Sequence, residues 1–124
     1  MNGFKKALTA TIFFLGITSQ AQAATQYTAP VTIVGSDKLV CSLANVGYKP
    51  AEVQVYVLGL NGVQLATTGL ITLGEGTVTT ASAGINLFTP AYCMFTFGTS
   101  KKNVRASGCV THTGTSCDAL IQAQ

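Results

Sequence analysis

The chain has 124 residues, of which 48% are hydrophobic and 9% charged, and its mean hydropathy is +0.42. This length allows one domain, and a hydrophobic chain with few charges does not have the composition of a disordered protein. The formal net charge of +3 is small, and the scarcity of charged residues leaves few candidates for a catalytic site.

The N-terminal segment, residues 1–23, has the pattern of a secretory signal peptide. Lys5 and Lys6 precede the apolar run Leu8–Ile17, and Ala21-Gln22-Ala23 provides the small residues of a cleavage site. The run of about 10 residues is shorter than the roughly 20 that a spanning helix needs, although an uncleaved anchor is the alternative. We therefore expect an exported protein, periplasmic or extracellular, without stable membrane insertion after cleavage. Loss of the two lysines lowers the net charge from +3 to +1, which argues against a nucleic-acid partner.

Short segments of alternating apolar and polar residues fill the remainder, 24–124, which we expect to form one domain. The expected strands, in chain order, are Val31–Val34, Lys38–Ala44, Glu52–Leu58, Val63–Ala66, Leu70–Leu73, Thr77–Ala81, Tyr92–Phe97 and Val104–Thr111. The tail Cys117–Gln124 fits either a helical turn or a final edge strand. This pattern predicts an all-β fold, a small immunoglobulin-like β-sandwich of about seven strands. The antibody signature is missing, because the chain has no Trp and Ala91 stands where that signature has Tyr.

Two turns in this series have specific predictions. Asn61-Gly62 predicts a type I′ hairpin turn, in which both central residues need positive φ. The polar segment Gly98–Asn103 is expected to be a solvated hairpin tip that carries a small basic cluster of Lys101, Lys102 and Arg105. A phosphate or lipid contact is the alternative interpretation of that cluster.

The four cysteines of an exported chain predict two disulfides. Cys41 and Cys93 each lie among apolar residues on the inward face of a separate strand, so we favour a Cys41–Cys93 bridge between two sheets. Cys109 and Cys117 then close a local loop. A metal site at Cys109, His112 and Cys117 is the alternative, but it lacks a fourth ligand, and we expect no metal.

Motifs for catalysis are missing from the sequence. There is no Gly-x-Ser-x-Gly, His-Glu-x-x-His, phosphate-binding glycine loop or Cys-x-x-Cys. His112 is the only His, and with Asp118 it forms the least implausible site for a small enzyme. We therefore expect a protein that is not an enzyme, with no catalytic residues and no cofactor.

Binding is the function class that these residues favour. Tyr48, Tyr56 and Tyr92 are expected on outward faces or turns, and together with Lys101, Lys102 and Arg105 they form a candidate surface for a protein or glycan partner. The alternative is that Tyr and Thr simply suit half-buried strands. A self-assembling surface subunit, pilus-like or adhesin-like, is a further possibility, in which Gln26–Val34 serves as a strand donated to a neighbouring copy.

Several short motifs in a fixed order also carry a resemblance. They are Asn45-Val46-Gly47 after a Cys-containing strand, Lys49-Pro50, Asn61-Gly62, Leu73-Gly74-x-Gly76, Tyr92-Cys93-x-Phe95 and Val104-Arg105-Ala106. In this order the chain resembles a loosely defined, largely uncharacterised group of small exported bacterial proteins. The resemblance implies an exported β-sandwich and transfers no catalytic residues. Glu75 and Met94 depart from it, since the group often has Pro and a basic or polar residue at these positions.

Overall fold

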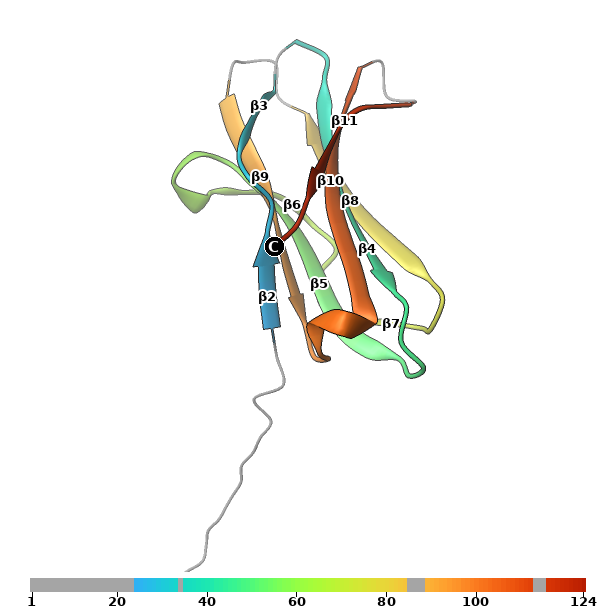
Figure 1. The fold of residues 1–124 in the computed structure, drawn as a ribbon. Coiled ribbons are helices and arrows are strands. Elements are labelled where there is room, and N and C mark those ends of the chain that lie inside the picture. The colour runs from blue at the N-terminus through green and yellow to red at the C-terminus, as the bar shows by residue number, and fades with distance from the viewer. Residues whose placement is uncertain (1–23, 34, 85–88, 113–115) are drawn as a thin grey trace, which may run out of the picture.

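The computed structural model describes residues 24–33, 35–84, 89–112 and 116–124 (Figure 1). The predicted signal peptide, residues 1–23, lies outside the described residues. Residues 34, 85–88 and 113–115 also lie outside them. The described chain forms two antiparallel sheets that pack face to face, which confirms the prediction of an all-β, two-layered fold.

The first sheet has four strands in the order β11 (Ser116–Gln122), β10 (Val104–His112), β4 (Lys38–Asn45) and β8 (Val78–Gly84). The second sheet has six strands. Its main order is β2 (Ala24–Tyr27), β9 (Thr89–Phe97), β5 (Ala51–Leu58) and β6 (Gln64–Thr67), while β3 (Val31–Ile33) also pairs with β9 and β7 (Ile71–Leu73) also pairs with β5. All of these pairings are antiparallel.

The described part of the chain has ten strands, more than the seven or so predicted. Two edge positions are each divided between two short strands, β2 with β3 and β6 with β7. Strand β2 was not among the expected strands of the sandwich, because Ala24–Tyr27 has no alternating apolar residues and pairs with β9. Its last two residues fall in the segment Gln26–Val34, which was considered only as a strand donated to another copy. The tail, for which helix and strand were both open, forms edge strand β11.

The core lies between the sheets and follows the period-2 alternation of the sequence. Val53, Val55 and Val57 of β5 are fully buried, as are Leu39 and Leu43 of β4 on the opposite sheet. Burial of each such side chain contributes about 1.5–3 kcal/mol. Because successive side chains of a strand point to opposite faces, this alternation fixes which residues of the same strands face outward.

Both predicted disulfides are present. Cys41–Cys93 joins β4 to β9 across the core, and Cys109–Cys117 joins the neighbouring strands β10 and β11 within the four-stranded sheet. Gly108 of β10 faces the first bridge, and a Cβ added there would lie 2.9 Å from the Sγ of Cys93. The absence of a side chain at this position therefore leaves room for the bridge between the sheets.

The two turn predictions have different outcomes. Asn61 and Gly62 have φ angles of 61° and 75°, which confirms the positive φ expected at both central positions. The prediction of a hairpin tip at Gly98–Asn103 is wrong, since the strands that flank it, β9 and β10, belong to different sheets. Strand β10 pairs instead with β4, far away in the sequence, so this segment is a connection between the two layers.

One edge of the sandwich is closed by the C-terminal residues. The backbone N–H of Tyr27 donates to the carbonyl oxygen of Gln124, and the N–H of Gln124 donates to the carbonyl oxygen of Tyr27, each at 2.9 Å. The N–H of Ala123 donates to the carbonyl oxygen of Ala106 at 3.2 Å. The C-terminus thus connects β2 of one sheet with β10 of the other (Figure 1).

Candidate functional site

The outer side of the six-stranded sheet carries an aromatic surface, the tyrosine face, made of Tyr27, Tyr56, Tyr92 and Met94. In the strand register Met94 of β9 lies opposite Tyr27 of β2 on one side and opposite Tyr56 of β5 on the other. Tyr92 stands two residues before Met94, on the same side of β9. The rings of Tyr27 and Tyr92 pack with centroids 6.3 Å apart at 46°.

A groove continues this surface beneath the turn between β5 and β6. It has a volume of about 520 Å³ and is lined by Pro30, Gly59, Leu60, Asn61, Gly62, Pro90 and Tyr92. Leu60 is 61% exposed and Tyr27 is 49% exposed, so large apolar groups face solvent here. The residues of the tyrosine face and of the groove include no Lys, Arg, His, Asp or Glu.

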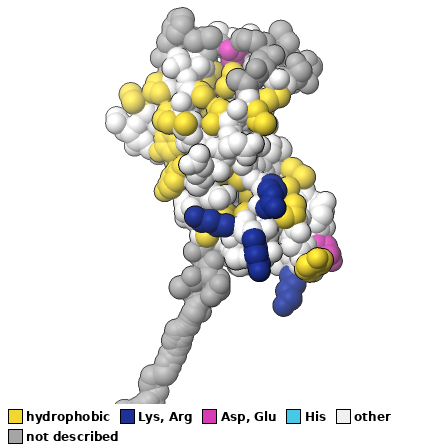
Figure 2. All heavy atoms as spheres, in the orientation of Figure 1, with side chains coloured by type: hydrophobic (Ala, Val, Ile, Leu, Met, Phe, Trp, Pro, Cys, Tyr) yellow, Lys and Arg dark blue, Asp and Glu magenta, His cyan; other side chains and the backbone are white. Residues whose placement is uncertain are grey.

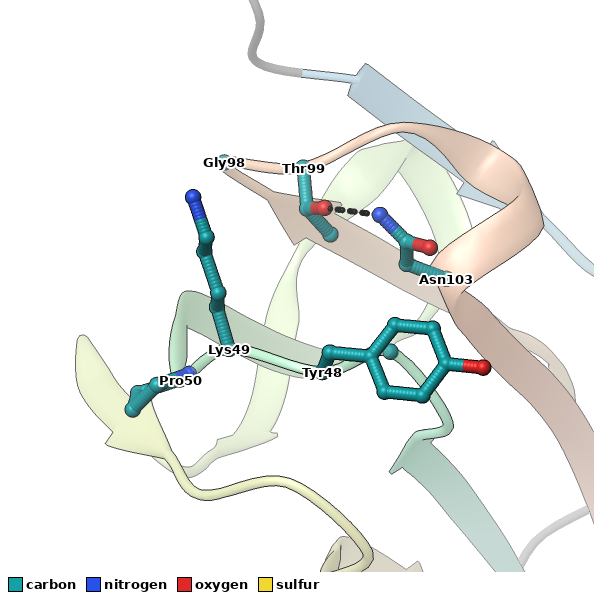
Figure 3. A pocket seen from close by; sticks show the side chains of 7 residues that line it. Tyr48, Lys49, Pro50, Gly98, Thr99 and Asn103 are labelled. Atoms are coloured by element: carbon teal, nitrogen blue, oxygen red, sulfur yellow. Dashed lines mark hydrogen bonds between the residues drawn. The ribbon is translucent and has the colours of Figure 1, made fainter.

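The basic residues gather elsewhere, at one end of the sandwich. Figure 2 shows Lys and Arg side chains together at the lower end of the sandwich in this view. We call this the loop end and define it by the β4–β5 loop (46–50), the β9–β10 loop (98–103) and Arg105. Between the two loops lies a hollow of about 340 Å³, lined by Gly47, Tyr48, Lys49, Pro50, Gly98, Thr99 and Asn103 (Figure 3).

Asn45 holds the first of these loops in place. Its side chain is 1% exposed, its Nδ2 donates to the carbonyl oxygens of Lys49 (2.8 Å) and Leu73 (2.9 Å), and its Oδ1 accepts from the N–H of Gly47 (2.9 Å). A buried amide that satisfies three backbone groups fixes the path of the loop that carries Tyr48 and Lys49.

The second loop is fixed against the first. The backbone N–H of Val46 donates to the carbonyl oxygen of Asn103 at 2.8 Å, and the Nδ2 of Asn103 donates to the Oγ1 of Thr99 at 2.8 Å (Figure 3). The Nη1 of Arg105 donates to the carbonyl oxygens of Lys102 (3.2 Å) and Val104 (2.8 Å). The guanidinium is thus oriented by backbone groups rather than by a carboxylate.

The structure divides the candidate binding residues into two groups. Tyr56 and Tyr92 belong to the tyrosine face, where both are half-buried. Tyr48, Lys101, Lys102 and Arg105 belong to the loop end, and Tyr48 is 93% exposed there.

The structure also adds residues that were not predicted from the sequence as binding candidates. Tyr27 was missed because its strand was not predicted, and Met94 because a methionine within a strand usually belongs to the core. Lys49 was missed although it is adjacent to Tyr48, because only the fold brings the two loops together. The alternation of β9 was the one signal from which Met94 could have been placed on the outer face.

The remaining candidates are the metal and enzyme alternatives. Cys109 and Cys117 are bonded to each other, so neither offers a free thiolate to a metal. Among the described residues no group of three or more His, Cys, Asp or Glu could hold a metal ion. The side chains of His112 and Asp118 lie outside the described part of the structure, so the enzyme alternative is not tested.

Comparison with known proteins adds no relative: no protein-family model, no curated protein and no solved structure matches the chain. The resemblance to small exported bacterial proteins therefore stays a prediction. In the described ranges, no helix is long and apolar enough to cross a membrane.

Proposed function

We propose that this is an exported binding protein without enzymatic activity, a component of the cell envelope or of the extracellular matrix. In this proposal residues 1–23 are a signal peptide, and the domain is an immunoglobulin-like sandwich. Two disulfides support export, because such bridges persist in oxidising compartments. The bridge between the two sheets supports the immunoglobulin-like assignment, whereas the pairing of β10 with β4 departs from the usual arrangement.

The tyrosine face is the observation that carries this proposal. Contiguous exposed apolar patches on the surface of a protein mark interaction sites, and Tyr is enriched at interfaces because its ring is apolar and its hydroxyl is polar. Here three of the four tyrosines share one face with Met94 and adjoin an apolar groove. The partner is therefore a protein or glycan that presents an uncharged surface.

The test is capture of a partner from the native envelope or medium by the mature protein. The variant Tyr27→Ser/Tyr92→Ser removes the paired rings of the tyrosine face. Leu120→Ser is the matched control, because Leu120 is 63% exposed on β11 of the other sheet and belongs to neither candidate surface. The proposal predicts a partner that wild type and Leu120→Ser retain and the double variant loses. Equal retention by all three proteins would contradict it, as would turnover of a substrate that His112→Ala abolishes.

Self-assembly is the second candidate, favoured by the N-terminal strands. Strands β2 and β3 both pair with β9, in registers that differ by one residue on either side of the segment 28–30. In this structure the chain's own strands β2 and β3 occupy the edge position beside β9. An exchange would place these two strands beside β9 of another copy instead. Light scattering of the mature protein separates the candidates: a monomer rules out exchange, and a concentration-dependent series of oligomers supports it.

A further inference from the structure

We propose that the loop end is a second binding site, for a carboxylated polysaccharide. The hollow between the two loops, which Lys49 lines, would take one sugar unit, and Lys101, Lys102 and Arg105 at the same end of the sandwich would contact carboxylates of neighbouring units of the polymer. This site shares no residue with the tyrosine face, so it extends the proposed function without depending on it.

Charge is the first argument. Four of the five cations of residues 24–124 lie at this end: Lys49, Lys101, Lys102 and Arg105. Across the described residues, none of the four forms an ion pair with a carboxylate. Glu52 and Glu75 also lie near this end, so four positive charges face two negative ones and a local excess of +2 remains. Such an excess attracts an anion.

The fixed guanidinium of Arg105 is the second argument. Its Nη1 already donates to two backbone carbonyl oxygens, so the side chain is oriented before any ligand arrives. An oriented guanidinium loses less entropy on binding than a free one, and its planar N–H groups match the two oxygens of a carboxylate. The lysines add charge without such directional demands.

The shape and lining of the hollow favour a sugar. Its volume of about 340 Å³ is within the range of about 300–1,000 Å³ typical of small-molecule sites. On one wall the Nδ2 of Asn103 donates to the Oγ1 of Thr99, which leaves the hydroxyl hydrogen of Thr99 and the amide oxygen of Asn103 for a ligand. The ring of Tyr48, a residue that is 93% exposed, stands at the other wall (Figure 3). Hydroxyl and amide groups hydrogen-bond sugar hydroxyls, while a flat ring suits the apolar face of a sugar.

The alternatives of the same charge fit less well. A lipid headgroup at a flat membrane surface makes no use of a hollow with polar walls. Single-stranded nucleic acid is bound by a series of aromatic side chains along a basic groove, whereas the loop end has one Tyr and two nearby carboxylates. A carboxylated glycan uses the hollow, the ring and the cations together.

The experiment measures binding of the mature protein to polygalacturonate, with neutral dextran as the control polymer. We expect binding to polygalacturonate alone, and its weakening when the salt concentration is raised from about 50 to about 500 mM, because exposed charges are then screened. The variant Lys49→Gln/Arg105→Gln should weaken binding about tenfold or more. Lys38→Gln is the matched control, since it removes the one other cation of residues 24–124, at the opposite end of β4, and should change affinity less than about twofold.

Three results would overturn the proposal. The first is no binding to polygalacturonate at low salt. The second is a loss of affinity in Lys38→Gln as large as the loss in Lys49→Gln/Arg105→Gln. The third is binding to phosphatidylglycerol vesicles without binding to polygalacturonate, which would assign the loop end to a membrane surface. None of these results affects the tyrosine face, whose test uses other variants.

Discussion

A methyl group added at Gly108 tests how closely the two sheets pack around the Cys41–Cys93 disulfide. In Gly108→Ala the new Cβ would lie 2.9 Å from the Sγ of Cys93, 3.4 Å from the Cγ2 of Thr28 and 3.5 Å from the Cδ1 of Leu39. Carbon and sulfur atoms do not approach this closely without displacement, and the sulfur is held on its other side by the bond to Cys41. The sheets must therefore move apart, or the bridge must shift.

The expected cost follows from two opposing effects. Overpacking of a well-packed core costs about 1–3 kcal/mol, while replacing Gly by Ala restricts the unfolded chain and returns about 0.4–1 kcal/mol. Overpacking prevails, so the free energy of unfolding should fall by about 1–2 kcal/mol. For a domain of this size the melting temperature then falls by about 5–15 °C. Thermal and urea unfolding under oxidising conditions measure both quantities.

Gly74→Ala is the matched control, because its Cβ would meet nothing closer than the Cγ2 of Thr77 at 3.8 Å. We expect its stability to remain within about 0.5 kcal/mol of wild type or to rise slightly. A second control combines Gly108→Ala with Cys41→Ala/Cys93→Ala, in which the sulfur is gone and the penalty should disappear. Equal stability of Gly108→Ala and Gly74→Ala, or an unchanged penalty without the disulfide, would refute the reasoning.

Three further predictions concern the groups that hold the fold and the loop end. Removing the Cys41–Cys93 bridge by Cys41→Ala/Cys93→Ala should lower the free energy of unfolding by about 4 kcal/mol, and Cys109→Ala/Cys117→Ala should lower it by about 2.5 kcal/mol, because the bridges span 52 and 8 residues. Urea unfolding that ranks the two variants in the opposite order would contradict this. Thr28→Val should lower the free energy of unfolding by about 1–3 kcal/mol, since Thr28 is 4% exposed and its Oγ1 accepts from the N–H of Cys93 at 2.9 Å. Thr25→Val is the control, because Thr25 is exposed. An equal change in both variants would count against a specific role for this hydrogen bond. Asn45→Ala should lower the free energy of unfolding by about 2–3 kcal/mol, because three backbone groups lose their hydrogen-bond partner. It should also weaken polygalacturonate binding, because the β4–β5 loop loses its fixed path. Unchanged stability and binding would show that Asn45 does not hold the loop.

The features that the sequence predicted well are local or periodic. The alternation of Val53, Val55 and Val57 identifies β5 and its buried face, because a strand repeats every two residues. Asn61-Gly62 identifies its turn because few dipeptides accept positive φ at both positions. The disulfide pairing followed because Cys41 and Cys93 lie on inward faces of well-marked strands.

The features that it could not predict depend on pairings between distant segments. Strand β2 has no apolar alternation, and it forms because the edge of β9 and the backbone of Gln124 provide hydrogen-bond partners. Pairing of β10 with β4 changes Gly98–Asn103 from a hairpin tip into a connection between layers. Both candidate sites arise from such pairings, since Tyr27 joins Tyr92, and Lys49 joins Asn103, only in the folded chain.

The accessibility of the tyrosines in the native setting tests the central claim most directly. Tyrosine nitration of intact cells or native envelope, followed by mass spectrometry, is compared with nitration of the purified mature protein. If the tyrosine face binds a partner, Tyr27 and Tyr92 are protected in the native setting and become reactive at their purified-protein rates after extraction. Equal nitration rates of Tyr27 and Tyr92 in both settings would contradict the account.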